Sequence, residues 1–151
     1  MTRYLLDRDV LSALEDPRGN RNVHTWSDTL PDDALFVGAV TVMEARKGFA
    51  RRRINARTDA DRTEIQGYEA VFADLLDAFA DRVLPLDRAA AESWGEMLAQ
   101  REAHVMDAAV AAIAAVHGLV VATRNLRHFR GRGVRLVDPF QPRPRIEEPG
   151  A

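Results

Sequence analysis

Three acidic residues, Asp7, Glu44 and Asp107, have the types and surroundings that could do chemistry. Asp7 ends the apolar run in "YLLDRDVLSAL", Glu44 lies in "TVMEARKGF", and Asp107 opens the alanine-rich stretch "MDAAVAAIAAV". Carboxylates held close together repel one another unless a cation lies among them, and hard oxygen ligands suit Mg²⁺ or Mn²⁺. Such an ion can activate water and offset charge on a phosphoryl group. The acids therefore indicate metal-dependent phosphoryl chemistry if the fold brings them together.

Short apolar runs alternate with longer helical patterns along the chain. The runs predicted as strands cover residues 3–7, 35–40, 82–86, 119–123 and 134–138. Helices are predicted over about 8–16, 20–30, 42–53, 61–80, 87–103 and 107–117, with a short one after Thr123. Strands that are apolar throughout and interleaved with helices indicate an α/β fold with a parallel sheet covered on both faces. Pro85 favours an edge position for the third strand.

Polar oxygen ligands follow the ends of several predicted strands. Asp7 ends the first strand, Glu44 follows the second, and Asp107 precedes the fourth by one helix that Gly118 ends. Thr123 and Asn125 come directly after the fourth strand. In a parallel sheet the carboxyl ends of the strands meet at one edge, where ligands usually bind. We therefore expect these side chains to converge.

Each acid also has a simpler explanation. An acid in the first turn of a helix is favoured by the helix dipole, which could account for Glu44, in a helix capped by Thr41, and for Asp107. Asp9 is expected to be a cap or a solvated first-turn acid rather than a ligand. The convergence of several carboxylates is harder to explain in this way.

Basic residues surround the predicted acidic edge. From Ala108 to Val137 there is no Asp or Glu, while Arg124, Arg127, Arg130, Arg132 and Arg135 fall in that span. The stretch "RKGFARRR", which includes Arg46 and Arg53, follows Glu44 directly. Basic side chains beside a metal site would suit a phosphodiester backbone. A solvated helix face, or an arginine surplus set by genome composition, would give the same pattern.

Composition limits the other functions. With 151 residues and 46% hydrophobic residues, the chain is long enough for one domain with a sizeable core, expected over residues 1–140. The tail "QPRPRIEEPGA" (141–151) is rich in proline and charge and is expected to be disordered. The absence of cysteine excludes disulfides, thiolate zinc sites and a cysteine nucleophile, and is compatible with the cytoplasm. The longest apolar run, "AAVAAIAAV", is too short for the roughly 20 residues of a membrane span.

Taken as a set, the stretches "LLDRDVLSAL", "TVMEARKGFARR", "VMDAAVAAIAAVHGLVVATRNLRHF" and "GVRLVDPF" resemble the PIN-domain ribonuclease toxins of the VapC type, especially the FitB-like branch. The resemblance implies a three-layer α/β/α sandwich around a parallel five-stranded sheet. It also implies a homodimer, Mg²⁺- or Mn²⁺-dependent cleavage of RNA, and neutralisation by a small cognate antitoxin. Carried over by position, the family's acids are Asp7, Glu44 and Asp107.

The sequence departs from the family pattern at two places. Arg8 and Asp9 stand where the family usually has Thr and Asn, and His128 stands where a fourth acid is normal. Asn125 remains as an oxygen ligand near that position, and the side chains that could join the site are His128, Asp9 and Thr123. The alternative for His128 is that it packs beside Phe129.

The expected activity is hydrolysis of RNA by metal-activated water, with single-stranded or loop regions of tRNA, rRNA or mRNA as substrate. The expected metal ligands are Asp7, Glu44, Asp107 and Asn125, and the expected RNA contacts are Arg46, Arg53, Arg124 and Arg127. One alternative is an impaired PIN fold that binds RNA or antitoxin without cutting. A second is a haloacid-dehalogenase-like phosphatase with Asp7 as nucleophile, against which the chain offers only one lysine, Lys47, and no Asp-Asp after the fourth strand.

Overall fold

A five-stranded parallel sheet forms the centre of the molecule. The structure is a computed structural model that describes residues 1–150. The strands are β1 (Tyr4–Leu6), β2 (Leu35–Gly38), β3 (Val83–Leu84), β4 (Val120–Ala122) and β5 (Leu136–Val137). Their order is β3-β2-β1-β4-β5, and every neighbouring pair is parallel. The predicted sheet is confirmed, and β3 lies at an edge as Pro85 indicated.

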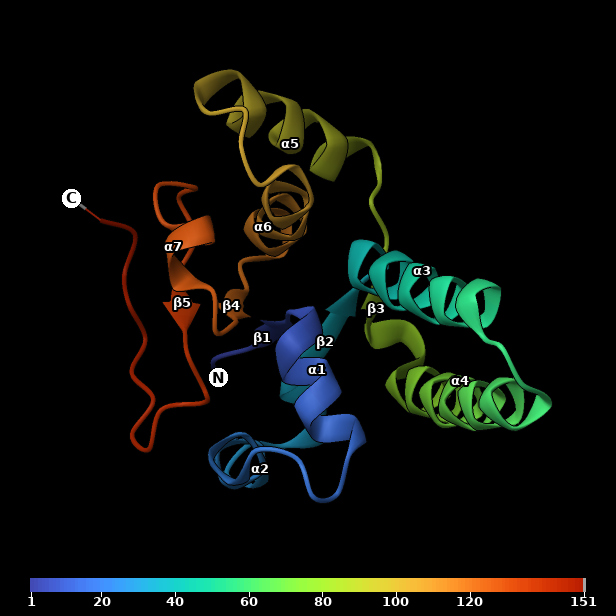
Figure 1. Cartoon of the computed structure of the whole chain (residues 1–151). Coiled ribbons are helices and arrows are strands. Elements are labelled where there is room, and N and C mark those ends of the chain that lie inside the picture. Colours follow the sequence, from blue (N-terminus) through green and yellow to red (C-terminus); the bar gives the residue numbers. More distant parts are fainter. Residues whose placement is uncertain (151) are drawn as a thin grey trace.

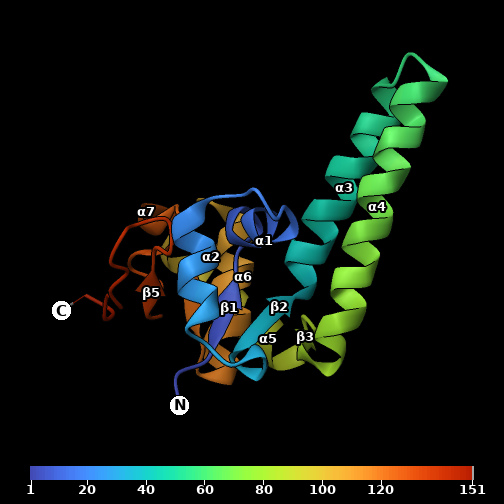
Figure 2. The same cartoon turned by 90° about the horizontal axis from the view of Figure 1, so that it is seen from below.

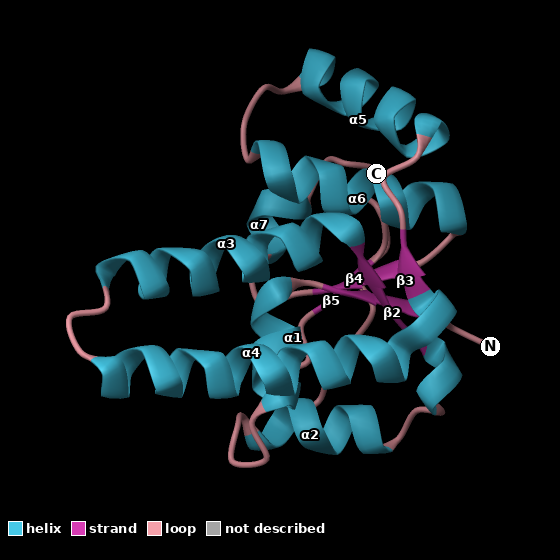
Figure 3. Cartoon of the chain, turned by 90° about the vertical axis from the view of Figure 1, so that its right-hand side faces the viewer, coloured by secondary structure: helices cyan, strands magenta, loops and turns pink. Residues whose placement is uncertain are grey.

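Helices cover both faces of this sheet. They are α1 (Arg8–Glu15), α2 (Arg21–Asp28), α3 (Ala39–Asn55), α4 (Asp59–Phe79), α5 (Arg88–Gln100), α6 (Val105–His117) and α7 (Leu126–Phe129), with 3-10 turns at Asp32–Ala34 and Ala80–Arg82. α1 and α2 lie on one side of the sheet, and α5 and α6 lie on the other (Figure 1). α3 and α4 form a long hairpin that projects away from the sheet (Figures 2 and 3). The predicted three-layer sandwich is confirmed.

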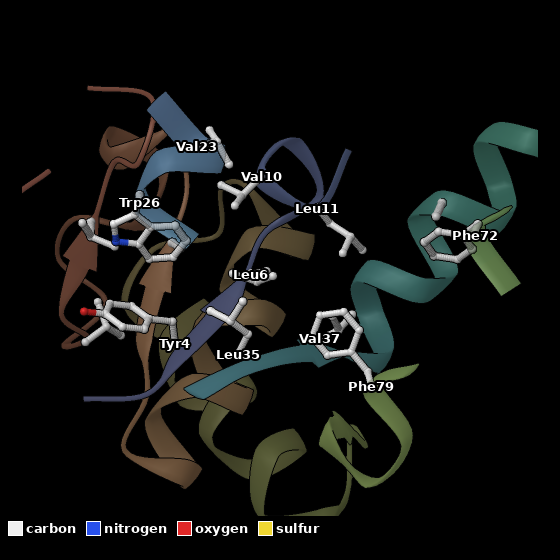
Figure 4. Packing of buried hydrophobic residues seen from close by; sticks show 14 of the residues in the cluster. Tyr4, Leu6, Val10, Leu11, Val23, Trp26, Leu35, Val37, Phe72 and Phe79 are labelled. Atoms are coloured by element: carbon white, nitrogen blue, oxygen red, sulfur yellow. The ribbon is translucent and has the colours of Figure 1, made fainter. Parts of the chain in front are cut away.

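Successive strand residues contribute to two separate cores. Tyr4 and Leu6 of β1 pack in the core beneath α1 and α2, where the Tyr4 and Trp26 rings meet edge to face with centroids 5.1 Å apart (Figure 4). Leu5, between them, packs in the core against the buried alanine face of α6. Strands buried on both faces need no polar positions, which is why their sequences are apolar throughout.

α3 begins earlier than the sequence indicated. It starts at Ala39, directly after β2, and its N-cap position is Gly38 rather than Thr41. A Cβ at Gly38 would lie 3.2 Å from Ile113 Cδ1, so the missing side chain lets α6 pack closely against this turn. Thr41 is buried inside the helix, and Glu44 is in its second turn instead of its first. The prediction of a Thr41 cap was wrong because β2 is shorter than the apolar run that predicted it.

The end of α6 and the C-terminal segment bear on two further predictions. Gly118, with φ of +66°, ends α6 as predicted, because a left-handed backbone at the C-cap favours glycine. The segment predicted as a disordered tail lies along β5, where Glu147 forms an antiparallel bridge with Leu136 and accepts two hydrogen bonds from Arg130. Disorder of 141–151 in solution stays a prediction, and Ala151 lies outside the described residues. Within 1–150, every helix is too short or too polar to cross a membrane.

Candidate active site

Asp7 is buried at the point where β1 ends. Its backbone N–H donates to the Ala122 carbonyl over 2.9 Å, which continues the pairing with β4. Its Oδ1 accepts from the Arg8 N–H over 2.9 Å, and its Oδ2 accepts from Thr123 Oγ1 over 2.8 Å. Burial, with the negative charge of Asp9 as the next cause, raises the pKa of Asp7 to about 7. A cation that approaches this carboxyl group would stabilise its ionised form.

Glu44 and Asp107 face the same region as Asp7. Burial and the charge of Asp107 raise the pKa of Glu44, and the charge of Asp107 also contributes to the raised pKa of Asp7. Asp107 lies in the first turn of α6, which begins two residues before the predicted start. The structure therefore brings the three predicted carboxylates within electrostatic reach of one another, from β1, α3 and α6.

Thr123, Asn125 and Asp9 connect the ends of β1 and β4. Thr123 Oγ1 donates to Asp7 and accepts from the Asn125 N–H over 3.0 Å. Asn125 occupies the N-cap position of α7 but its side chain does not cap the helix, which leaves its amide oxygen available. Asp9 lies in the first turn of α1 as expected, but it is partly buried rather than solvated. Its Oδ2 accepts from the Arg124 N–H over 3.0 Å, and burial raises its pKa.

His128 points toward the acidic cluster rather than only packing beside Phe129. Its Nδ1 lies 2.9 Å from Asp107 Oδ2. The ring of His104 stacks on the ring of His128, with centroids 3.8 Å apart and planes inclined by 13°. Sequence reasoning missed His104. It precedes α6 as the N-cap residue with a left-handed backbone, so helical spacing gave no signal for it.

The loop that carries His104 is fastened by a buried arginine. Arg132, only 5% exposed, donates from Nη1 to the carbonyls of Met97 (2.8 Å) and Arg101 (3.0 Å), and from Nη2 to that of Ala103 (2.5 Å). Arg101 in turn donates to the His128 carbonyl over 3.2 Å. Arg132 had been grouped with the residues that might meet a phosphodiester backbone. Because it is buried against three carbonyls, it positions this loop instead.

The arginines predicted to contact RNA form two pairs, Arg46 with Arg53 on α3 and Arg124 with Arg127 beside α7. Arg46 and Arg53 both donate to Glu69 Oε1 on α4, over 3.2 and 3.0 Å, and both remain about half exposed. The guanidinium of Arg124 lies 3.8 Å from the centroid of the Phe140 ring. Arg127 is exposed. Arg46 and Arg53 follow Glu44 by two and by nine residues along α3, and Arg124 and Arg127 lie on either side of Asn125 in the sequence.

The donor set of the cluster fits a hard divalent cation. Glu44 Oε1 is buried and has no hydrogen-bond partner. A buried acceptor without a partner is costly, and three carboxylates that repel one another add to that cost. A cation bound by these oxygens would remove both penalties. Mg²⁺ and Mn²⁺ prefer such oxygen ligands.

Fold and site together define a known class. Residues 4–133 match the PIN domain family, and the chain belongs to that family. It is 32% identical over 143 residues to VapC ribonuclease Y4jK of Sinorhizobium fredii, a match that covers 91% of this chain and 98% of that protein. It is 29% identical over 141 residues to toxin FitB of Neisseria gonorrhoeae, covering 90% of this chain and 97% of the toxin.

Solved structures agree with the sequence matches. The structure of FitAcB from Neisseria gonorrhoeae superimposes with a TM-score of 0.75 at 29% identity, covering 91% of this chain and 99% of the other. FitAB bound to a DNA fragment superimposes with a TM-score of 0.74 at 28% identity, covering 91% and 96%. The resemblance to VapC-type PIN domains is therefore confirmed. The same matches leave the phosphatase alternative without support.

Proposed function

We propose that this chain is the toxin of a toxin–antitoxin pair and acts as a divalent-metal-dependent endoribonuclease. The observation that carries the proposal is the cluster of Asp7, Glu44 and Asp107, in which burial first, and then the charge of neighbouring acids that include Asp107, raises the pKa of Asp7 and of Glu44. The similarity to proteins named VapC ribonuclease and toxin FitB supports the same activity.

Asp7, Glu44 and Asp107, with the amide oxygen of Asn125, would hold Mg²⁺ or Mn²⁺. When bound, the ion supplies positive charge for the phosphoryl oxygens and makes water a better nucleophile. Thr123 fixes the orientation of Asp7 through its hydroxyl hydrogen bond. Asp7, with a pKa of about 7, gives up its proton readily as positive charge arrives.

The arginines position the RNA strand. Arg124 and Arg127 lie beside Asn125, and Arg46 and Arg53 lie on the same helix as Glu44. Exposed guanidinium groups bind phosphate oxygens without reading base sequence, so they would hold the backbone of tRNA, rRNA or mRNA across the cluster. Single-stranded or loop RNA is the expected substrate because its unpaired bases and backbone can reach the cluster where a duplex cannot.

Two protein partners belong to the proposal. The FitAcB and FitAB structures are complexes named for two components, and we infer a small cognate antitoxin for this chain as well. We also infer that the chain forms a homodimer. Sedimentation of the purified chain at micromolar concentration tests the dimer, and a monomer under those conditions would contradict it.

The activity is tested by RNA cleavage with purified protein. Cleavage should stop in EDTA and return with excess Mg²⁺ or Mn²⁺. Asp7→Asn, Glu44→Gln and Asp107→Asn should each lower the rate roughly 100-fold or more, because each removes charge from the site of the reaction. Asp77→Asn, at an exposed position on α4, is the matched control.

Cleavage that persists in EDTA would contradict the metal requirement. RNA or antitoxin binding without cleavage under any metal would favour the impaired PIN fold.

A further inference from the structure

Two histidines and one carboxylate gather at the start of α6. His104, Asp107 and His128 each offer one ligand atom, and these atoms lie within 4.8 Å of one another. His128 comes from α7, so the cluster joins two separate segments of the chain. We propose that His104, Asp107 and His128 form a binding site for a transition-metal ion such as Zn²⁺, with a ligand chemistry different from that of the carboxylate cluster.

The donor atoms decide which metal the site prefers. Imidazole nitrogens together with one carboxylate suit Zn²⁺ and Co²⁺, whereas Mg²⁺ favours oxygen ligands and retains several waters. Two nitrogens and one oxygen also leave a fourth position open in a tetrahedral site. Asp7 and Glu44 contribute oxygen only. The triad should therefore bind Zn²⁺ in the presence of an excess of Mg²⁺.

The side chains are already close to a binding arrangement. His128 Nδ1 lies 2.9 Å from Asp107 Oδ2, and the His104 ring stacks on His128 with centroids 3.8 Å apart. Ligand atoms around tetrahedral Zn²⁺ are separated by roughly 3.3 Å, given Zn–N bonds of about 2.0–2.1 Å. The triad must close slightly to reach this separation. His104 is exposed, so its ring is free to make that turn.

The backbone that carries the two histidines is held in place. Arg132 donates to the Arg101 and Ala103 carbonyls just before His104, and Arg101 donates to the His128 carbonyl. These bonds fasten the loop before α6 to α7. Ordering the ligands should therefore cost little free energy when an ion binds the triad, because the chain segments are already joined.

Asp107 belongs to both sites, which couples them. A Zn²⁺ ion on His104 and His128 would also bind the Asp107 carboxylate. Asp107 would then be less available to hold the catalytic cation together with Asp7 and Glu44. This consequence rests on the proposed function: micromolar Zn²⁺ should lower the RNA cleavage that Mg²⁺ supports. The binding itself does not depend on RNA cleavage.

The site is tested with untagged, metal-stripped protein in the absence of RNA. Zn²⁺ should bind with one ion per triad by calorimetry in excess Mg²⁺, and Co²⁺ should give visible absorption bands that Zn²⁺ removes. His104→Gly and His128→Gln should each weaken Zn²⁺ binding at least about tenfold, in line with the loss of a ligand. Glycine is chosen because His104 has a positive φ of 48°. His24→Ala and His117→Ala, outside the triad, should bind as wild type does.

Equal Zn²⁺ affinity in wild type, His104→Gly and His128→Gln would overturn the inference. Binding that is lost only with Asp7→Asn or Glu44→Gln would also overturn it, because the ion would then occupy the carboxylate cluster. If Zn²⁺ binds the triad but no metal supports RNA cleavage, the inference stands and the proposed function fails. If Mg²⁺ supports cleavage but the triad does not bind Zn²⁺, the proposed function stands and this inference fails.

Discussion

Thr123 donates a hydrogen bond from Oγ1 to Asp7 Oδ2 over 2.8 Å, and this bond joins the ends of β1 and β4. Leu6 and Ala122 are paired in the sheet, so Asp7 and Thr123 are the next residues along each strand. The same hydroxyl accepts from the Asn125 N–H, which ties the turn before α7 to the site. One small side chain thus orients a buried carboxylate and the loop beside it.

Thr123→Val should damage this arrangement, whereas Thr123→Ser should preserve most of it. Valine keeps the shape but takes the hydroxyl partner away from the buried Asp7 carboxyl and from the Asn125 N–H, which should lower the free energy of unfolding by about 1–3 kcal/mol. The Thr123 bond lowers the pKa of Asp7, so its loss should move that pKa further upward. Urea unfolding and a carbon-13 NMR titration of Asp7 measure the two effects. An unchanged Asp7 pKa in Thr123→Val would show that the hydroxyl does not act on the carboxylate.

We expect the contribution of the buried Asp7 to the stability of the metal-free protein to fall as the pH rises. Its pKa is about 7 in the folded protein and about 3.9 in an unfolded chain. Between these values the unfolded chain releases the proton and the folded chain keeps it, so stability falls as the pH rises from about 4 to 7 and then levels off. Asp7→Asn cannot titrate. Its advantage over wild type should grow by up to about 1.4 kcal/mol per pH unit in that window.

Urea unfolding in EDTA at several pH values between 4.5 and 8 measures this advantage. Asp77→Asn, whose side chain is exposed on α4, is the control and should differ from wild type by a constant amount. A pH-independent difference for Asp7→Asn would mean that Asp7 is ionised throughout this range.

Sequence patterns could predict the sheet and the elements that carry the three acids, because both depend on local regularities, whereas the role of the acids as metal ligands stays a prediction. Strands buried on both faces are continuously apolar, and Asp7 directly follows one of them. Glu44 and Asp107 were placed correctly relative to the sheet, although α3 and α6 begin earlier than the patterns indicated. At the start of α3, Ile113 lies so near Gly38 that a Cβ there would be 3.2 Å from its Cδ1, and such packing between distant segments leaves no local pattern.

His104 and Arg132 show the same limit at the candidate site. His104 lies outside the helical pattern of α6, with a left-handed backbone that no periodicity indicates. Arg132 follows several exposed arginines in the sequence and is chemically identical to them. Only the fold reveals that it is buried beneath the carbonyls at the end of α5. Long-range contacts, rather than residue type, separate a structural arginine from one that is free to bind RNA.

Arg132→Met should therefore be far more harmful than Arg130→Met. Arg132 donates to the carbonyls of Met97, Arg101 and Ala103. Methionine would leave the Arg101 and Ala103 carbonyls without this donor, whereas the Met97 carbonyl still accepts from the Arg101 N–H. We expect a loss of roughly 2–4 kcal/mol in the free energy of unfolding and faster amide exchange near His104. Arg130 forms a half-exposed ion pair with Glu147, which water and salt screen, so its loss should change the free energy of unfolding far less. Similar losses in the two variants would contradict the role given to Arg132.

His128→Asp tests the position where this chain departs from its family. The new carboxylate would lie beside Asp107, whose Oδ2 is 2.9 Å from the present imidazole. Added repulsion should lower the stability of the metal-free protein, and an added oxygen ligand should tighten Mg²⁺ binding. We expect RNA cleavage to be retained or raised, with half-maximal activity at lower Mg²⁺. Unfolding in EDTA and in Mg²⁺, together with a Mg²⁺ titration of cleavage, measures these effects.

His128→Ala separates the effect of the added acid from the loss of the imidazole. Alanine removes a nitrogen that can bind Mn²⁺ and a partner of Asp107 without adding charge. Its activity should fall, and its preference should shift away from Mn²⁺. The contrast between the two variants arises because a carboxylate restores an oxygen ligand and alanine restores none. If both variants match wild type in rate and in metal dependence, His128 does not take part in the site, and the centre rests on Asp7, Glu44 and Asp107.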